Sequence, residues 1–508
     1  MSNTTEPSPS PSQPPWWITA LLSVGMAVAA LLLRLPFLGE SLWADELHTA
    51  WVVADDAQTI PLRAAMGNQS PLYFFGVWTW LQAVGMHQWS LRLPSLIAGI
   101  FAVGLVTAVS HRWSKDAWIA LGIGLLAAMD NDWIFFATEA RTYTLVQWVA
   151  ILQVLLAWDA SQNDRTSAWI GLVALSLTNF YLHYTTILFT TCVGIAILIC
   201  ASDRTIRKHF ALASIGLLLG IGISVPHLMT IFERRSNWAQ FISATSSNEW
   251  YRWETVFAML LPAGIASVIA WFRHETNITS IDRRRFVFLI LVVLLPITIA
   301  WLTTATGVAA LFFGRYLFSA ETCVLILLAS MMTLLPGRWI GRAAIVLALL
   351  ICCVYRLPTQ WQTMRGEEWP TIVNAVSQNI EAMDTPPEIV IAAGLIETDF
   401  LRTKHANEAP WDDYARLPIE SIYHLPEAAK KRFGLTYTNS GEPTPRYLEE
   451  STPESVVIMI VRGNKAKANQ VATRFRDALP DRHYQIKTPK PQASGVQWRI
   501  LVPHLGDN

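Results

Sequence analysis

The sequence predicts a polytopic α-helical membrane protein that continues into a small α/β domain. Apolar runs of about 20 residues recur from Trp16 to about Tyr355, and each is long enough to cross a hydrocarbon core of roughly 30 Å. Of the 508 residues, 52% are hydrophobic and 15% are charged, whereas a soluble chain carries about 25% charged residues. From residue 357 onward these long apolar runs stop.

Composition predicts the state of the N-terminal segment, and the lengths of the apolar runs predict the membrane spans. Residues 1–15 are rich in Ser, Thr and Pro, and we expect them to form a disordered cytoplasmic tail. They lack the basic region and cleavage pattern of a secretory signal, so the first span should be retained. Residues 71–84 are apolar but short, which favours a helix lying in the membrane interface. We predict about eleven spans, at about 16–34, 92–111, 116–129, 141–158, 168–182, 185–200, 209–229, 255–272, 286–303, 316–335 and 339–356.

Short basic loops alternate with acidic ones along this series of spans. The basic segments all fall on one side under the eleven-span prediction, and the positive-inside rule places that side and the N-terminus in the cytoplasm. We therefore expect a multi-pass protein of the cytoplasmic (inner) membrane with an extracytoplasmic C-terminal domain. The basic segments are 111–115, 203–208, 273–285 and 338–342. The predicted parts are a transmembrane domain at 16–356, with a first outer loop at about 35–91, and a C-terminal domain at 357–508.

The C-terminal domain shows alternating strand and helix patterns but no catalytic constellation. We expect it to act as a lid or packing module. All five cysteines lie inside apolar runs, so no disulfide framework is expected in this domain. Strands are predicted at 388–393, 455–461 and 496–502, and helices at 369–382 and 465–479.

An acidic stretch lies just past the end of the first span. Asp45, Glu46 and His48 occur within four residues there. Ionised groups beside hydrocarbon cost several kcal/mol unless they meet a counter-ion, a metal or water. The stretch is therefore either a solvated acidic loop or part of a functional site.

Other polar residues occur where spans reach the same outer side. Asp130 and Asp132 have a spacing that suits a divalent cation, although an Asp-Asn-Asp turn fits equally well. Arg141 needs an anionic partner at its depth, either Glu139 in a packing pair or a phosphate. The remaining polar residues at outer ends of spans are Tyr143, His183, Tyr184, Arg315 and Tyr316.

Several short motifs resemble membrane glycosyltransferases of the C-type fold. The resemblance is to the branch related to protein O-mannosyltransferases and the lipid A aminoarabinose transferase, and it covers about residues 30–330. Gln69 and Ser70 depart from the His-Pro that this family has before Pro-Leu-Tyr. Asp130 stands where many relatives have Ser, and near an Asp of the aminoarabinose branch. The motifs are Arg34-Leu35-Pro36, Trp43-Ala44-Asp45-Glu46, Pro71-Leu72-Tyr73, Ser90-Leu91-Arg92-Leu93-Pro94-Ser95, Glu139-Ala140-Arg141-Thr142-Tyr143, His183-Tyr184 and Arg315-Tyr316.

The resemblance implies transfer of a sugar from a polyprenyl-phosphate carrier on the outer face of the membrane. Lipid, glycan and protein hydroxyls all serve relatives as acceptors. Such a transfer needs a general base and a group that holds the phosphate. Asp45 is the expected base or metal ligand, and Glu46 is expected to orient it or to contribute to a metal site. The donor phosphate is assigned to Arg141, Arg315 and Tyr316.

The remaining roles are supporting ones. His48, Glu139, Tyr143, His183 and Tyr184 are expected to contact substrate or support the site. A divalent cation (magnesium, manganese or calcium) is the one expected cofactor, with Asp45, Asp130 and Asp132 as its tentative ligands.

Two other function classes compete with the transferase interpretation. A transporter or flippase for lipid-linked sugars would place charges at the bilayer midplane and show inverted repeats, but the charges here cluster at outer ends of spans. A non-catalytic scaffold would not need Asp45 and Glu46. A nucleic-acid partner is not expected, because the net charge is zero and no basic stripe is present.

Overall fold

The chain divides into two compact units in the computed structural model. The helical unit comprises Met1–Pro36 and Ser95–Gln362, and the sheet unit comprises Phe37–Pro94 and Thr363–Asn508. The predicted disordered tail up to residue 13, and the predicted span at 255–272 except for 264–265, lie outside the described residues. The structure describes residues 14–201, 203–234, 242, 264–265, 280–333, 338–360, 365–394, 410–427, 429, 431–435 and 441–503.

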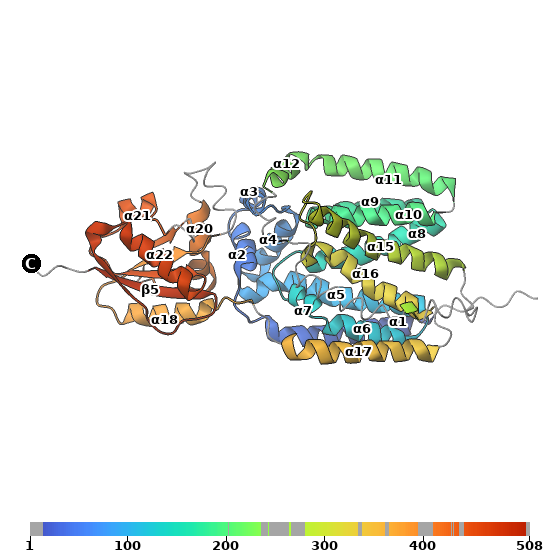
Figure 1. Ribbon diagram of the computed structural model, residues 1–508, viewed down its shortest axis with the longest axis horizontal. Coiled ribbons are helices and arrows are strands. Elements are labelled where there is room, and N and C mark those ends of the chain that lie inside the picture. Colours follow the sequence, from blue (N-terminus) through green and yellow to red (C-terminus); the bar gives the residue numbers. More distant parts are fainter. Residues whose placement is uncertain are drawn as a thin grey trace, which may run out of the picture. The chain divides into compact units, whose positions relative to one another are not determined.

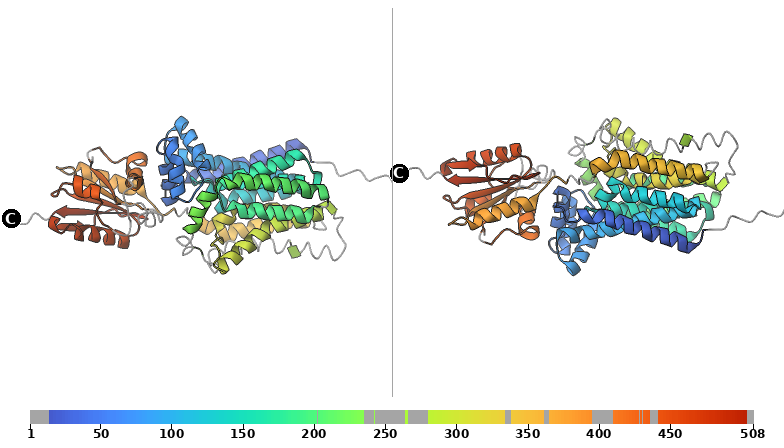
Figure 2. Two further views of the ribbon diagram at one scale, coloured as in Figure 1. Left: turned by 90° about the horizontal axis from the view of Figure 1, so that it is seen from above. Right: turned by 90° about the horizontal axis from the view of Figure 1, so that it is seen from below.

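Long apolar helices run side by side in the helical unit (Figures 1 and 2). Their buried faces form one continuous apolar core. The helices whose residues build this unit are α1 (Trp16–Arg34), α5 (Gln88–Ser114), α6 (Ala117–Met129), α7 (Asn131–Ala137), α8 (Tyr143–Asn163), α9 (Thr166–Leu182), α10 (Thr186–Cys200), α11 (Arg204–Gly222), α12 (Val225–Glu233), α15 (Ser280–Ala305), α16 (Gly314–Thr333) and α17 (Arg338–Gln360).

The predicted membrane class is confirmed by the length and composition of these helices. Among the described residues, 5 helices are long and apolar enough to span a membrane, or 7 if two bent pairs each count as one span. The bent pairs are α6 with α7, at 59°, and α11 with α12, at 67°. Three further predicted spans coincide with apolar helices of 10–17 residues, in α9, α10 and the Trp339–Ile351 part of α17.

Described residues in or next to the basic segments contact the ends of neighbouring helices in the helical unit. Arg342 at the start of α17 pairs with Asp116, which precedes α6 (2.9 Å). Arg285 of α15 lies over the ring of Trp113 near the end of α5 (4.9 Å). His209 of α11 approaches Asp164 at the end of α8 (2.8 Å). These contacts agree with the predicted loop pattern, while the side of the membrane stays a prediction.

Cysteine labelling tests that orientation. Single cysteines replace Arg112, an exposed residue of the basic segment 111–115, or Glu449, an exposed residue of the sheet unit. We expect a membrane-impermeant thiol reagent to label Glu449→Cys in intact cells whose outer barrier, if any, is permeabilised. Arg112→Cys should be labelled only after lysis, and the parent protein gives the background. The reverse pattern would contradict a cytoplasmic N-terminus.

A five-stranded mixed sheet organises the C-terminal part of the sheet unit. The strand order is β2-β1-β3-β5-β4; β1 is parallel to β2 and β3, whereas β5 is antiparallel to β3 and β4. Figure 1 shows α18 (Trp369–Glu381) and α22 (Lys465–Asp477) on opposite sides of the sheet. Every residue of β1 is buried, as expected for a strand covered on both faces. The strands are β1 (Glu388–Ala392), β2 (Arg432–Leu435), β3 (Val457–Arg462), β4 (Tyr484–Lys487) and β5 (Val496–Pro503).

The first outer loop folds as three short helices and belongs to the sheet unit. They are α2 (Ala44–Val52), α3 (Ile60–Met66) and α4 (Leu72–Val84). The acidic stretch forms α2, in which Glu46 to Val52 are all buried. The solvated-loop interpretation is therefore wrong for this stretch, because its apolar residues pack into a core.

Candidate functional site

The first turn of α2 presents Asp45 at the helix N-terminus. Trp43 precedes the helix in an extended conformation, and both acidic residues of the stretch fall in the first turn. Negative charge is favourable there, because the N-terminal N–H groups carry partial positive charge. Asp45 is only partly buried.

Glu46 has a different environment from its neighbour. Its two oxygens accept hydrogen bonds of 2.6 Å each from Nε and Nη2 of Arg92, near the start of α5. Both side chains are fully buried. Nη1 of Arg92 also donates to the carbonyls of Leu38 (2.9 Å) and Glu40 (2.6 Å). The carboxylate of Glu46 therefore fixes the position of the Arg92 guanidinium. That guanidinium in turn stabilises the backbone of residues 38–40, which precede α2.

His48 lies in the apolar interior of the same loop. Its ring centroid is 6.0 Å from that of Trp51 and 6.0 Å from that of Phe74. A Cβ atom added at Gly67 would lie 2.4 Å from the imidazole, so the backbone approaches this ring closely. His48 thus supports the packing of the helix that carries Asp45.

In the helical unit the structure brings together four residues that the sequence spreads over 174 positions. The ring of His183 lies 5.7 Å from that of Tyr143 and 5.6 Å from that of Tyr316. The guanidinium of Arg315 lies 5.8 Å from the Tyr143 ring centroid. Tyr143 begins α8, His183 follows α9, and the other two residues begin α16.

Arg141 lies close enough to His183 to lower the pKa of its imidazole. Burial, with the positive charges of Arg141 and Arg315, lowers the pKa of His183 to about 3. The imidazole is therefore uncharged at neutral pH, and its Nδ1 forms a 2.7 Å hydrogen bond with the Thr185 hydroxyl. Two guanidinium groups therefore lie beside an uncharged ring in an aromatic-lined group of residues (Arg141, Tyr143, His183, Arg315 and Tyr316), which we call the arginine cluster.

The backbone around Arg141 is anchored to α5. The carbonyl of Arg141 accepts a 2.7 Å hydrogen bond from the Ser95 hydroxyl. The Thr144 hydroxyl donates to the Ser95 carbonyl (2.9 Å). Arg141 is 7% exposed and Glu139 is fully buried. The residues between α7 and α8 are thus held in one conformation.

The Asp-Asn-Asp segment serves as a helix cap. Oδ1 of Asp130 accepts hydrogen bonds from the backbone N–H groups of Asp132 (2.9 Å) and Trp133 (3.2 Å) at the start of α7. Asp130 also interacts electrostatically with the fully buried Arg34. Asp130 and Asp132 belong to the helical unit and Asp45 to the sheet unit. Within the described residues, no group of three or more His, Cys, Asp or Glu side chains could hold a metal ion.

Tyr184 points into a neighbouring aromatic group. Its ring lies 5.1 Å from that of Phe180 and 5.5 Å from that of His227.

Three buried polar residues on α8, α10 and α16 were not predicted as site residues. Gln147 lies one turn after Tyr143 on α8, Thr186 begins α10, and Ser319 is on α16. Each is at most 3% exposed, and their side-chain polar atoms have no hydrogen-bond partner within the described structure. Buried polar atoms of this kind mark places for water or ligand. A glutamine inside an apolar run was the signal that would have found the first of them.

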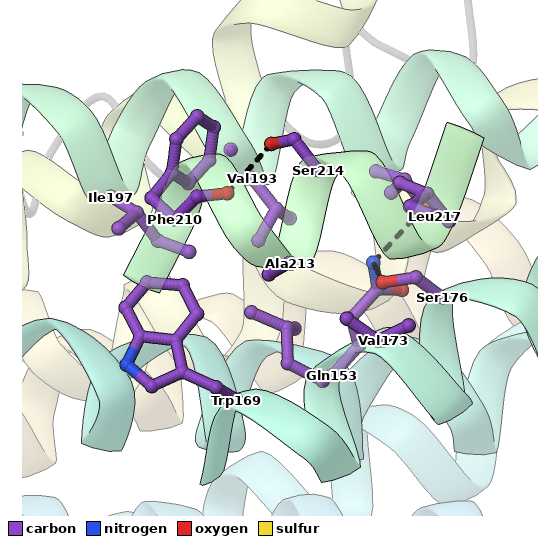
Figure 3. Close-up of a pocket in the computed structure, with 13 residues that line it drawn as sticks. Gln153, Trp169, Val173, Ser176, Val193, Ile197, Phe210, Ala213, Ser214 and Leu217 are labelled. Carbon is purple, nitrogen blue, oxygen red and sulfur yellow. Dashed lines mark hydrogen bonds between the residues drawn. The ribbon is translucent and has the colours of Figure 1, made fainter. Parts of the chain in front are cut away.

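A cavity opens among α8, α9, α10 and α11 (Figure 3). Its volume is about 50 Å³, and apolar side chains such as Trp169 and Phe210 form most of its wall. Its polar part is Gln153, whose Nε2 donates to the hydroxyls of Ser176 and Thr190 (3.0 Å each). None of the predicted site residues lines this cavity.

No family model matches the chain, and no curated protein matches it. The solved structures that are similar to it include two crystal structures of ArnT from Cupriavidus metallidurans. The apo form is 10% identical, with a TM-score of 0.41, and the match covers 96% of this chain and 97% of that one. The form bound to undecaprenyl phosphate is 10% identical, with a TM-score of 0.42, over 97% and 98% of the two chains.

Proposed function

We propose that this protein is a membrane glycosyltransferase that moves a sugar from a polyprenyl-phosphate carrier to a hydroxyl acceptor. The observation that carries the proposal is the arginine cluster. Arg141 and Arg315 both lie near the uncharged His183, and guanidinium groups bind phosphate oxygens through paired hydrogen bonds. The motif resemblance around Asp45 and Arg141 supports the same reaction class.

The transfer reaction gives each of the proposed site residues a role. The acceptor oxygen attacks the anomeric carbon and its proton passes to Asp45. If Asp45 were instead a ligand of a divalent cation, the ion would supply Lewis-acid stabilisation of charge at the site. The bond between the anomeric carbon and the phosphate oxygen breaks, and its electron pair leaves with polyprenyl phosphate. Arg141 and Arg315 stabilise the charge that builds on that phosphate. Tyr316 and the neutral His183 line the same cluster.

The cavity of Figure 3 has a mainly apolar wall, the kind of surface that a prenyl chain contacts. Its volume of about 50 Å³ is too small for more than a short part of such a chain. Asn179 links the cavity to the arginine cluster. Its Nδ2 donates to Oε1 of Gln153 (3.1 Å), and its carbonyl accepts from the backbone N–H of His183 (3.0 Å).

Release of polyprenyl phosphate tests the reaction, and variants of Arg141 test the site. Purified protein given acceptor and a sugar-charged carrier should release polyprenyl phosphate, detected by mass spectrometry. A hydrogen bond to a charged group contributes about 1.5 to 3 kcal/mol. We therefore expect Arg141→Ala to weaken donor affinity by roughly 10- to 100-fold. Arg141→Lys should lose less, because it keeps the charge but not the planar fork.

Arg112→Ala is the matched control, since Arg112 is an exposed residue of the basic segment 111–115. It should bind donor as the parent does. Normal donor affinity in both Arg141 variants would show that Arg141 is a packing residue. Absence of polyprenyl phosphate release across lipid, glycan and protein acceptors would contradict the proposed function.

A further inference from the structure

A larger cavity lies between the end of α10 and the start of α15, two helices that pack against each other. Its volume is about 350 Å³, compared with about 50 Å³ for the cavity of Figure 3. α10 ends at Cys200, and the part of α15 that is long and apolar enough to cross a membrane is Arg283–Ala305. The cavity therefore lies where the hydrocarbon-spanning part of α15 begins. We call it the basic cavity, and the described residues that line it are Ile199, Cys200, Ala201, Arg283, Arg284 and Val287.

The charged part of this lining consists of two adjacent arginines. Arg283 and Arg284 are the first two residues of the membrane-spanning part of α15, and both are exposed. Long cationic side chains at the end of a span extend toward the water and the lipid headgroups. Guanidinium groups bind phosphate oxygens through charge-assisted hydrogen bonds. The charged wall of the basic cavity therefore favours an anionic phosphate group.

The rest of the lining is apolar and continues along the membrane-facing side of α15. Ile199 is 58% exposed and Val287 is 39% exposed. Leu294 lies about two turns beyond Val287 on the same face of the helix, and it is also 39% exposed. Inorganic phosphate makes no favourable contact with such a surface, whereas a hydrocarbon chain does. The combination of arginines and exposed apolar side chains matches the two parts of a phospholipid.

Contacts beside the basic cavity fix its charged wall. The thiol of Cys200 donates a 3.8 Å hydrogen bond to the carbonyl of Arg284, which joins the end of α10 to the start of α15. The next residue, Arg285, has a different environment. Its guanidinium lies over the rings of Trp113 (4.9 Å) and Trp158 (5.6 Å), and it does not line the cavity. Arg283 and Arg284 can therefore be replaced while the packing of Arg285 is kept.

We propose that the basic cavity binds one anionic phospholipid of the leaflet that meets the start of α15. The headgroup phosphate contacts Arg283 and Arg284, and an acyl chain contacts Ile199, Val287 and Leu294. Basic pockets between membrane-spanning helices recognise lipid headgroups in this way. The bound lipid links the end of α10 to the start of α15 and stabilises their packing. The proposal does not rest on the proposed function, because none of these residues has a role in sugar transfer.

Titration of the purified full-length protein with phosphatidylglycerol in detergent tests this proposal. Native mass spectrometry counts the bound lipid molecules, and the melting temperature reports their effect on stability. Phosphatidylcholine with the same acyl chains has the phosphate but no net charge. Glycerol 1-phosphate has the phosphate but no acyl chain. Together these probes separate charge, phosphate and hydrocarbon as sources of binding.

Two double variants remove the same amount of charge from different places. Arg283→Gln with Arg284→Gln changes the basic cavity. Arg204→Gln with Arg207→Gln is the matched control, because Arg204 and Arg207 are exposed residues at the start of α11 and do not line the cavity. A third variant, Arg283→Lys with Arg284→Lys, keeps the charge and loses the planar fork.

The parent protein should retain one phosphatidylglycerol in preference to phosphatidylcholine and should melt at a higher temperature with it. We expect the double Gln variant of the basic cavity to weaken phosphatidylglycerol affinity by roughly 30-fold, about fivefold for each charge, and to lose the rise in melting temperature. The lysine variant should lose less. The α11 control should keep the parent affinity. Single Arg283→Gln and Arg284→Gln variants serve if the double variant does not fold.

Four results would overturn the proposal. Parent affinity for phosphatidylglycerol in the folded double Gln variant of the basic cavity would show that the lipid binds elsewhere. An equal loss in the α11 control would assign binding to general surface charge. Equal binding of phosphatidylcholine by the parent would remove the role of the arginines. Displacement of phosphatidylglycerol by glycerol 1-phosphate at equal concentration would identify a site for soluble phosphates instead of a lipid site.

Discussion

Asp45→Asn is expected to lower the rate of sugar transfer by about 10² to 10⁴, the usual cost of losing a general base. The substitution keeps the size of the side chain and removes the charge that accepts the proton or binds a metal. Asp45 is partly exposed at the start of α2, so the melting temperature in detergent should change little. The measurement is single-turnover release of polyprenyl phosphate by parent and variant at equal protein concentration.

Chelation separates the two roles left open for Asp45. If Asp45 is a base without a metal, a chelator leaves the parent rate unchanged. If it is a ligand, a chelator reduces the parent rate to that of Asp45→Asn, and added magnesium, manganese or calcium restores it. Asp56→Asn is the matched control, because Asp56 is an exposed acid of the same loop. Transfer at the parent rate by a well-folded Asp45→Asn protein would remove Asp45 from the mechanism.

Glu46→Gln should be one of the most destabilising single changes in the sheet unit. It leaves the fully buried Arg92 without its carboxylate partner, and breaking a buried pair costs about 3 to 5 kcal/mol. We expect a marked fall in melting temperature in detergent and faster proteolysis between α2 and α4. Asp55→Asn gives the comparison. Asp55 is 54% exposed in its pair with Arg63, and exposed pairs contribute about 0 to 1 kcal/mol.

A comparison of Glu46→Gln with Asp45→Asn identifies the role of Glu46. The folded fraction of Glu46→Gln should transfer sugar at a rate closer to the parent than Asp45→Asn does, since the structure gives Glu46 a structural partner. An unchanged melting temperature combined with loss of transfer would contradict that role. Glu46 would then act on substrate or metal directly.

Most of the helical unit could be predicted from the sequence because its signals are local. The run at 168–182 became α9 (Thr166–Leu182), and the run at 185–200 became α10 (Thr186–Cys200). A span must satisfy its backbone hydrogen bonds within one helix and bury apolar side chains, so length and hydropathy suffice. In the sheet, β1, β3 and β5 were predicted, whereas β2 and β4 were not. These two strands have only 4 residues each and lie at the sheet edges, where the apolar signal is weak.

The arginine cluster could be predicted only as a set of residues, not as a site. Arg141, His183 and Arg315 each stand near the end of an apolar run, which suggested one face of the membrane. The distances between their rings and charges depend on how α8, α9 and α16 pack. For Asp130 the sequence left a metal ligand and a turn equally open, and the structure shows the helix cap that favours the turn.

The sequence by itself therefore determined which segments are helices, which residues are expensive to place at the membrane surface, and the reaction class that their motifs resemble. Only the tertiary structure decided which partner each charged side chain contacts. Glu46 pairs with a residue 46 positions away, and Ala44 bonds to Glu367, 323 positions away. Such partners follow from packing between elements, for which the local periodicity of a sequence carries no signal. Helix formation depends on neighbours within a few residues, whereas the partners of Glu46 and Ala44 come from elements far along the chain.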